Sequence, residues 1–158
     1  MKTLILFAIL ESVSPRHADI IRSAFLRWQV YQAFEVRESS DPLAVQVAWT
    51  YIDGPGGTMA ETRGTVLGHN ENSITFDRDE LWTPDTLLWV AMHEIGHLVF
   101  GNNYGRPGVR HGTGDSLMGP WVRSDIPARL TLDDIKILSK QYGSIRVIPQ
   151  RSKGAFRP

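Results

Sequence analysis

TPDTLLWVAMHEIGHLVFG, residues 83–101, is the stretch of this sequence that decides the fold. Thr83 is a residue type that caps helix N-termini, and Pro84 is well suited to the first helical position. Asp85 is favourable in the first turn, because its charge complements the positive end of the helix dipole. Gly101 can end a helix, so we predict a helix from Pro84 to about Phe100.

Two histidines and a glutamate on this helix predict a metal site. His93 and His97 are four residues apart, so their side chains project from one face and can reach one zinc ion at about 2.0–2.1 Å. Glu94 lies beside them, where it can contact a metal-bound water without ligating the metal. The neighbouring residues are apolar, and polar groups buried among them need compensation. A zinc site explains this pattern better than two structural histidines.

The third ligand must come from a restricted set of residues. The chain has no cysteine, no glutamate after Glu94, and one histidine after His97, which is His111. We predict His111 as the third ligand. The alternatives are Asp115 as the third ligand, a site with only two histidine ligands, and a site that holds no metal.

The rest of the chain predicts a mixed α+β domain, because strands come first and helices follow without regular alternation. Ser14 and Pro15 can begin a helix that runs to about Tyr31, and Thr131 can cap a last helix from Leu132 to Tyr142, before Gly143. The predicted strands are residues 4–10, 34–38, 43–51, 65–67 and 73–76. Residues 102–127 contain no such pattern and are expected to form a long functional loop.

The net charge of the chain and its apolar runs limit the kinds of binding partner and the location that can be expected. Seventeen basic and seventeen acidic residues cancel, which gives no argument for nucleic acid or a membrane surface as a partner. Residues 4–10 form a short apolar run with no cleavage-site pattern after it, so we expect a β-strand rather than a signal peptide. No other run approaches transmembrane length. We expect a soluble monomer whose compartment the sequence does not indicate. The expected organisation is a domain over residues 1–143 and a basic tail over 144–158.

Five ordered motifs resemble the matrixin branch of the metzincins, the catalytic domain of matrix metalloproteinases. They are residues 24–28 (AFLRW), 53–57 (DGPGG), 76–83 (FDRDELWT), 90–97 (VAMHEIGH) and 130–135 (LTLDDI). The resemblance implies a metzincin-like domain with three helices and a twisted, mostly parallel sheet of about five strands. It also implies that Met118, seven residues after His111, forms the Met-turn that supports the metal site.

The sequence departs from the family pattern at several positions. Phe100 and Asn103 stand where the family has a glycine and the third histidine. His111 therefore lies eight residues after the family position of the third ligand. Glu61 and Thr75 stand where the family has two histidines of a structural zinc site. Gly119 follows Met118 where an aromatic residue is usual. With Pro120 beside it, Gly119 predicts an altered or roomier specificity pocket.

The resemblance further implies a calcium site made of two loops. Asp53, Asp77 and Glu80 match carboxylate ligands, and Gly54, Gly56 and Thr58 match carbonyl donors. Hard oxygen ligands of this kind suit calcium. A solvated turn next to an acidic helix N-terminus is the alternative interpretation.

The function implied is zinc-dependent hydrolysis of peptide bonds in proteins or peptides by a zinc-bound water that Glu94 activates. One alternative is a zinc-binding module on the same fold that has lost or reduced turnover. Another is a structural or interaction protein that uses the fold without metal. An intact Glu94 argues against both, because a pure binding site has no need of a base at that position.

Overall fold

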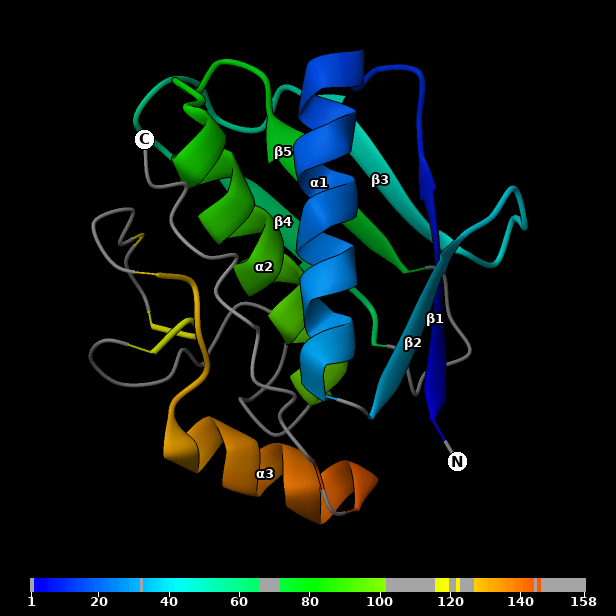
Figure 1. Cartoon of the computed structure of the whole chain (residues 1–158). Coiled ribbons are helices and arrows are strands. Elements are labelled where there is room, and N and C mark those ends of the chain that lie inside the picture. Colours follow the sequence, from blue (N-terminus) through cyan, green and yellow to red (C-terminus); the bar gives the residue numbers. More distant parts are fainter. Residues whose placement is uncertain are drawn as a thin grey trace, which may run out of the picture.

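The computed structural model describes residues 2–31, 33–65, 72–101, 116–119, 122, 127–143 and 145. Its helices are α1 (Pro15–Trp28), α2 (Pro84–Phe100) and α3 (Leu132–Tyr142), and a short 3-10 helix (Gln29–Tyr31) follows α1. Its strands are β1 (Thr3–Ile9), β2 (Phe34–Glu38), β3 (Val45–Thr50), β4 (Ala60–Arg63) and β5 (Ser73–Asp77) (Figure 1).

The five strands form one sheet in the order β2-β1-β3-β5-β4. The pairs β1–β2, β1–β3 and β3–β5 are parallel, whereas β4 runs antiparallel to β5 and forms one edge. The predicted α+β class and mostly parallel sheet are confirmed. The apolar run at the N-terminus is strand β1, which lies inside the sheet between β2 and β3.

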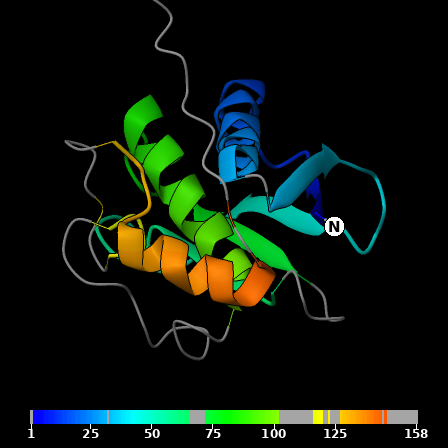
Figure 2. The same ribbon diagram turned by 60° about the horizontal axis from the view of Figure 1, so that its bottom comes forward.

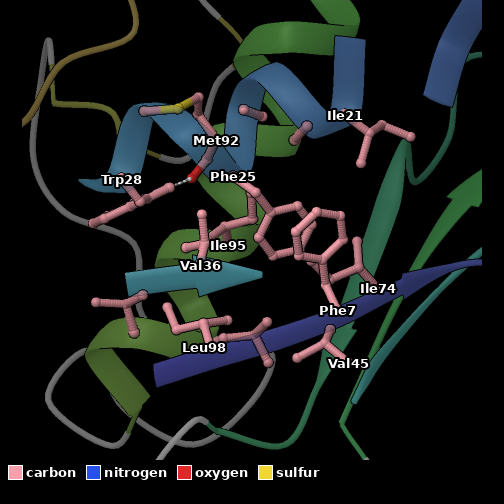
Figure 3. Packing of buried hydrophobic residues seen from close by; sticks show 14 of the residues in the cluster. Phe7, Ile21, Phe25, Trp28, Val36, Val45, Ile74, Met92, Ile95 and Leu98 are labelled. Atoms are coloured by element: carbon pink, nitrogen blue, oxygen red, sulfur yellow. Dashed lines mark hydrogen bonds between the residues drawn. The ribbon is translucent and has the colours of Figure 1, made fainter. Parts of the chain in front are cut away.

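Helices α1 and α2 lie side by side over the sheet (Figure 1). Between α1 and β1, the rings of Phe25 and Phe7 stack with their centroids 4.0 Å apart. Between the two helices, Trp28 Nε1 donates a hydrogen bond to the backbone oxygen of Met92 at 3.2 Å (Figure 3). Helix α2 is buried without interruption from residue 89 to residue 96. A helical segment that is buried on all sides in this way lies in the protein interior.

The predicted caps explain where the helices begin. The side chains of Ser14, Thr83 and Thr131 each accept a hydrogen bond from a backbone N–H in the first turn of α1, α2 and α3. Helices α2 and α3 have the predicted bounds. Helix α1 is shorter than predicted, because its last turn, Gln29–Tyr31, tightens into a 3-10 helix.

Helix α3 lies at the C-terminal end of α2 (Figure 2), where the Tyr142 hydroxyl donates to the Val99 carbonyl at 2.5 Å. At the N-terminal end of α3, the Asp134 carboxylate caps the helix. It accepts from the Thr131 N–H and hydroxyl, each at 2.8 Å, and from the Ser116 hydroxyl at 2.5 Å. One carboxylate thus joins the start of α3 to the turn that contains Ser116.

The strand predicted at residues 65–67 is wrong at Thr65, which belongs to no strand, while residues 66 and 67 lie outside the described part. The edge strand is β4, Ala60–Arg63. Its sequence, AETR, has a single β-branched residue, so its strand conformation depends on pairing with β5 rather than on local preference. Among the described residues, no helix combines the length and the hydrophobicity that crossing a membrane requires.

Candidate active site

Helix α2 brings His93, Glu94 and His97 together at one point. The Nε2 atoms of the two histidines lie 3.0 Å apart, and one carboxylate oxygen of Glu94 lies within 4.8 Å of the ring nitrogens. His93 and Glu94 are 7% and 6% exposed, and His97 is half-buried. Among the described residues, this is the only group of three or more histidine or acidic side chains close enough to hold one ion.

The orientation of His93 is fixed by two neighbours. Its Nδ1 lies 2.7 Å from the backbone oxygen of Leu117, and its ring stacks on Trp89 with centroids 5.6 Å apart. A carbonyl oxygen only accepts, so the proton is on Nδ1, and Nε2 of the neutral ring presents its lone pair to the site. A hydrogen bond from the ring nitrogen that faces away from the metal to a backbone carbonyl is typical of metal-binding histidines. The residues present therefore fit a zinc ion.

A tight turn lies directly beneath the histidines. The Gly119 N–H donates to the backbone oxygen of Ser116 at 2.9 Å. Met118, which lies between these two residues in the sequence, is fully buried. A Cβ atom added to Gly96 would lie 2.3 Å from the Met118 sulfur, so a larger residue at this position would displace the Met118 side chain. Met118 lies where a support for the site would be, and its supporting role stays a prediction.

Glu94 is held by the edge strand. The Thr62 hydroxyl donates to Glu94 Oε2 at 2.6 Å. Burial raises the pKa of Glu94 to about 7, even though the Thr62 hydrogen bond lowers it, and the nearby charge of Glu61 raises it further. A carboxyl group with a pKa near neutrality can both take and give a proton at physiological pH. Sequence reasoning missed Thr62, whose contact with Glu94 depends on the register of β4.

A cavity of about 400 Å³ opens beside His93 and Glu94. Its other lining residues are Gly57, Thr58, Met59, Ala60, Trp89, Val90, Gly119 and Val122. Gly119 is the residue predicted to alter this pocket, whereas Pro120 lies outside the described residues. The large Trp89 ring in the wall was not anticipated, because an apolar residue on a buried helix gives no sign of facing a cavity.

The candidates for the third ligand are not placed. His111 and Asp115 lie outside the described residues, as do Asn103, which occupies the family position of the third histidine, and most of the loop between α2 and Ser116. The choice of His111 over Asp115 stays a prediction.

The predicted calcium residues lie in two loops that are tied together. Asp77 is fully buried, and its Oδ2 faces the N–H groups of Ile52, Asp53 and Gly54 at 3.1–3.3 Å. The pKa of Asp77 lies below its ordinary value, chiefly because the Asp79 N–H donates to its carboxylate. Fixed N–H donors therefore stabilise the ionised form of this carboxylate.

The other two predicted carboxylate ligands also accept hydrogen bonds from backbone groups. Asp53 accepts from the N–H and the hydroxyl of Thr58, the latter at 2.7 Å. Glu80 Oε1 accepts from the N–H groups of Gly56 and Gly57 at 2.6 and 3.0 Å. Gly54 and Gly56 have φ values of 88° and 82°, which favour glycine and let the loop turn its N–H groups inward. Calcium binding here stays a prediction.

Comparison with known proteins gives consistent matches. The model of the family described as Matrixin matches residues 12–143. Stromelysin-3 of Xenopus laevis is 35% identical over an alignment of 101 residues, which covers 60% of this chain and 19% of that protein. Matrix metalloproteinase-19 of Mus musculus is 31% identical over an alignment of 144 residues, which covers 75% of this chain and 25% of that protein. The chain thus spans a quarter or less of these relatives.

Proposed function

This chain belongs to the matrixin family, and on that premise we propose that it is a zinc-dependent endopeptidase acting on proteins or peptides. The observation that carries the proposal is the geometry on α2. The Nε2 atoms of His93 and His97 face each other at 3.0 Å, next to a buried glutamate with a pKa near 7. An extended sheet edge and a cavity adjoin this group.

His93 and His97 would hold the zinc ion through Nε2, and we propose His111 as the third ligand. When bound, zinc supplies a Lewis acid that polarises a peptide carbonyl and lowers the pKa of a coordinated water to about 7. The Leu117 carbonyl keeps the proton of His93 on Nδ1, so that Nε2 stays available as a ligand. Met118 supports the turn of α2 that carries both histidines.

Glu94 acts as the general base and then as the general acid. Its carboxylate takes a proton from the attacking water and later gives it to the leaving amine. Burial keeps the pKa of the group near the operating pH, which suits both steps. Among the described residues, strand β4 forms an edge of the sheet, where an extended peptide would pair with it as an added strand. The cavity beside Glu94 then receives one substrate side chain.

We also propose that Asp53, Asp77 and Glu80 bind calcium with help from Gly54, Gly56 and Thr58. The three carboxylates do not converge on one point in this structure, so their oxygens would have to move closer together when the ion binds. The support is the resemblance of both loops to the family motif and the hydrogen bonds that already hold the two loops together. In this role calcium would be structural, because Asp53, Asp77 and Glu80 do not line the cavity beside Glu94.

The proposal of an endopeptidase is tested by measuring metal content and cleavage together. The purified chain is loaded with zinc, analysed for bound metals, and assayed on a library of internally quenched peptides. We expect about one catalytic zinc per chain and cleavage that a chelator abolishes and added zinc restores. Zinc binding without cleavage of any peptide would instead indicate the zinc-binding module that has lost turnover.

A further inference from the structure

Thr62 links the substrate edge of the sheet to the helix that carries the site. Along β4, the side chains of Ala60 and Thr62 are half-buried, and those of Glu61 and Arg63 are exposed. This alternation turns Thr62 toward α2. There its hydroxyl oxygen lies 2.6 Å from Glu94 Oε2 and 3.0 Å from the Glu94 backbone oxygen.

One hydroxyl proton has two acceptors in this arrangement, and the side chain is the better one. A hydrogen bond to an ionised carboxylate is shorter and about twice as strong as a bond to a neutral carbonyl. The backbone oxygen also lies within an α-helix, where the N–H four residues later supplies a donor. The 2.6 Å distance to Oε2 agrees with donation to the carboxylate.

We propose that Thr62 is a positioning residue for the general base, an inference that rests on the proposed function. Its hydroxyl fixes Glu94 Oε2 against β4 and leaves Oε1 to take the proton of the attacking water. A glutamate side chain has three rotatable bonds, and misplacing a catalytic group by about 1 Å can cost about 100-fold in rate. The same hydrogen bond joins the base to the strand that would receive the peptide.

A neighbouring threonine provides a matched control. Thr65 Oγ1 donates to the backbone oxygen of Leu98 at 3.1 Å, one turn further along α2. This bond also fastens the segment after β4 to the helix, but it does not involve the carboxylate of Glu94. Replacing Thr65 therefore tests a purely structural contact between the same two parts of the fold.

The first experiment compares Thr62→Val, Thr62→Ser and Thr65→Val in the zinc-loaded chain. Valine keeps the shape of threonine without the hydroxyl, and serine keeps the hydroxyl. We expect Thr62→Val to lower kcat about 10- to 100-fold, the effect of losing one hydrogen bond to a charged group, with KM nearly unchanged. Thr62→Ser should restore most of kcat, and Thr65→Val should leave it unchanged. Zinc content should be equal in all three variants.

The second experiment does not depend on activity. In the zinc-free protein, the melting temperature is measured for Thr62→Val with Glu94 present and with Glu94→Ala. We expect Thr62→Val to cost about 2–4 °C more when Glu94 is present, because only then does it leave a buried carboxylate without its donor. A matched cycle with Thr65→Val should show no such coupling.

The outcomes separate this inference from the proposed function. An active wild-type chain whose Thr62→Val variant keeps its kcat, or whose Thr62→Ser variant is equally impaired, would overturn the positioning role. Equal melting shifts with and without Glu94 would overturn the contact itself. A zinc-bound wild-type chain that cleaves nothing would refute the proposed function, while the melting cycle would still decide whether Thr62 holds Glu94.

Discussion

The histidine-bearing turn of α2 and the two loops around Asp53 and Asp77 both carry residue types that bind metals, but their donor atoms are arranged differently. On α2, the Nε2 atoms of His93 and His97 converge to 3.0 Å, and Leu117 orients one ring from behind. In the loops, each carboxylate faces its own set of backbone N–H groups.

This difference shows what a metal would contribute in each region. The two Nε2 atoms on α2 lie at a spacing that suits two ligands of one zinc ion. The loop carboxylates are already stabilised by N–H donors, so the loops can close before any ion binds. We therefore expect zinc to be essential for function and calcium to add only stability.

Replacing Glu94 by glutamine should have the largest effect. Glutamine keeps the shape of the side chain but cannot take a proton, so kcat should fall by at least about 100-fold. Zinc content and melting temperature should stay close to those of the wild type, as elemental analysis and thermal unfolding would show. Loss of zinc in this variant would mean that Glu94 is a ligand, contrary to the assignment.

His111→Ala should weaken zinc binding strongly. Residues that hydrogen-bond to metal ligands contribute about 10- to 100-fold in metal affinity, and a direct ligand should contribute at least as much. Competition titration with a zinc chelator measures the change, with Asn103→Ala and Asp115→Ala as controls that should bind like the wild type. If Asp115→Ala loses zinc and His111→Ala does not, the assignment of the third ligand is wrong and the peptidase proposal stands.

Calcium should raise the melting temperature without being needed for zinc. A ligand at 100 times its Kd stabilises the folded state by about 2.7 kcal/mol, which corresponds to several degrees in a domain of this size. Asp53→Asn should remove the response, and Glu35→Gln, which changes an exposed carboxylate on β2, should keep it. If added calcium does not change the melting temperature of the wild type, the assignment of Asp53, Asp77 and Glu80 as calcium ligands is wrong.

Gly96→Ala should destabilise the protein, although helix propensity alone would make alanine stabilising by about 1 kcal/mol. The added methyl group would overlap the Met118 sulfur, and overpacking of this kind costs about 1–3 kcal/mol. Urea unfolding measures the change. The cost should shrink when Met118→Ala is also present; an equal cost in both backgrounds would show that Met118 is not the cause.

The parts of the fold that could be predicted from sequence are those with local signals. Thr83 and Thr131 cap their helices through their own side chains, so the starts of α2 and α3 could be read directly. The bounds of β4 could not, because AETR becomes a strand only through pairing with β5. The end of α1 was misjudged, since a 3-10 turn shares the apolar spacing of the helix before it.

The residues of the candidate site also fall into those that a local sequence pattern predicts and those that only the tertiary structure brings together. His93, Glu94 and His97 could be predicted because their spacing on one helix fixes their relation. Thr62 reaches Glu94 from 32 residues away in the sequence, and Leu117 contributes a backbone carbonyl that every residue has. The inward alternation of Ala60 and Thr62 would have indicated Thr62 only after β4 had been placed.

The shared carboxylate of Asp134 has a consequence for how the protein opens. Because the carboxylate accepts hydrogen bonds from both the first turn of α3 and the Ser116 turn, opening either turn breaks a bond to the same group. The amides of Met118 and Ile135 should therefore exchange with solvent as one cooperative unit. His93 contacts that unit through the Leu117 carbonyl. An ion held by His93 and His97 should thus slow amide exchange throughout α3, although no residue of the His93–Glu94–His97 group belongs to that helix.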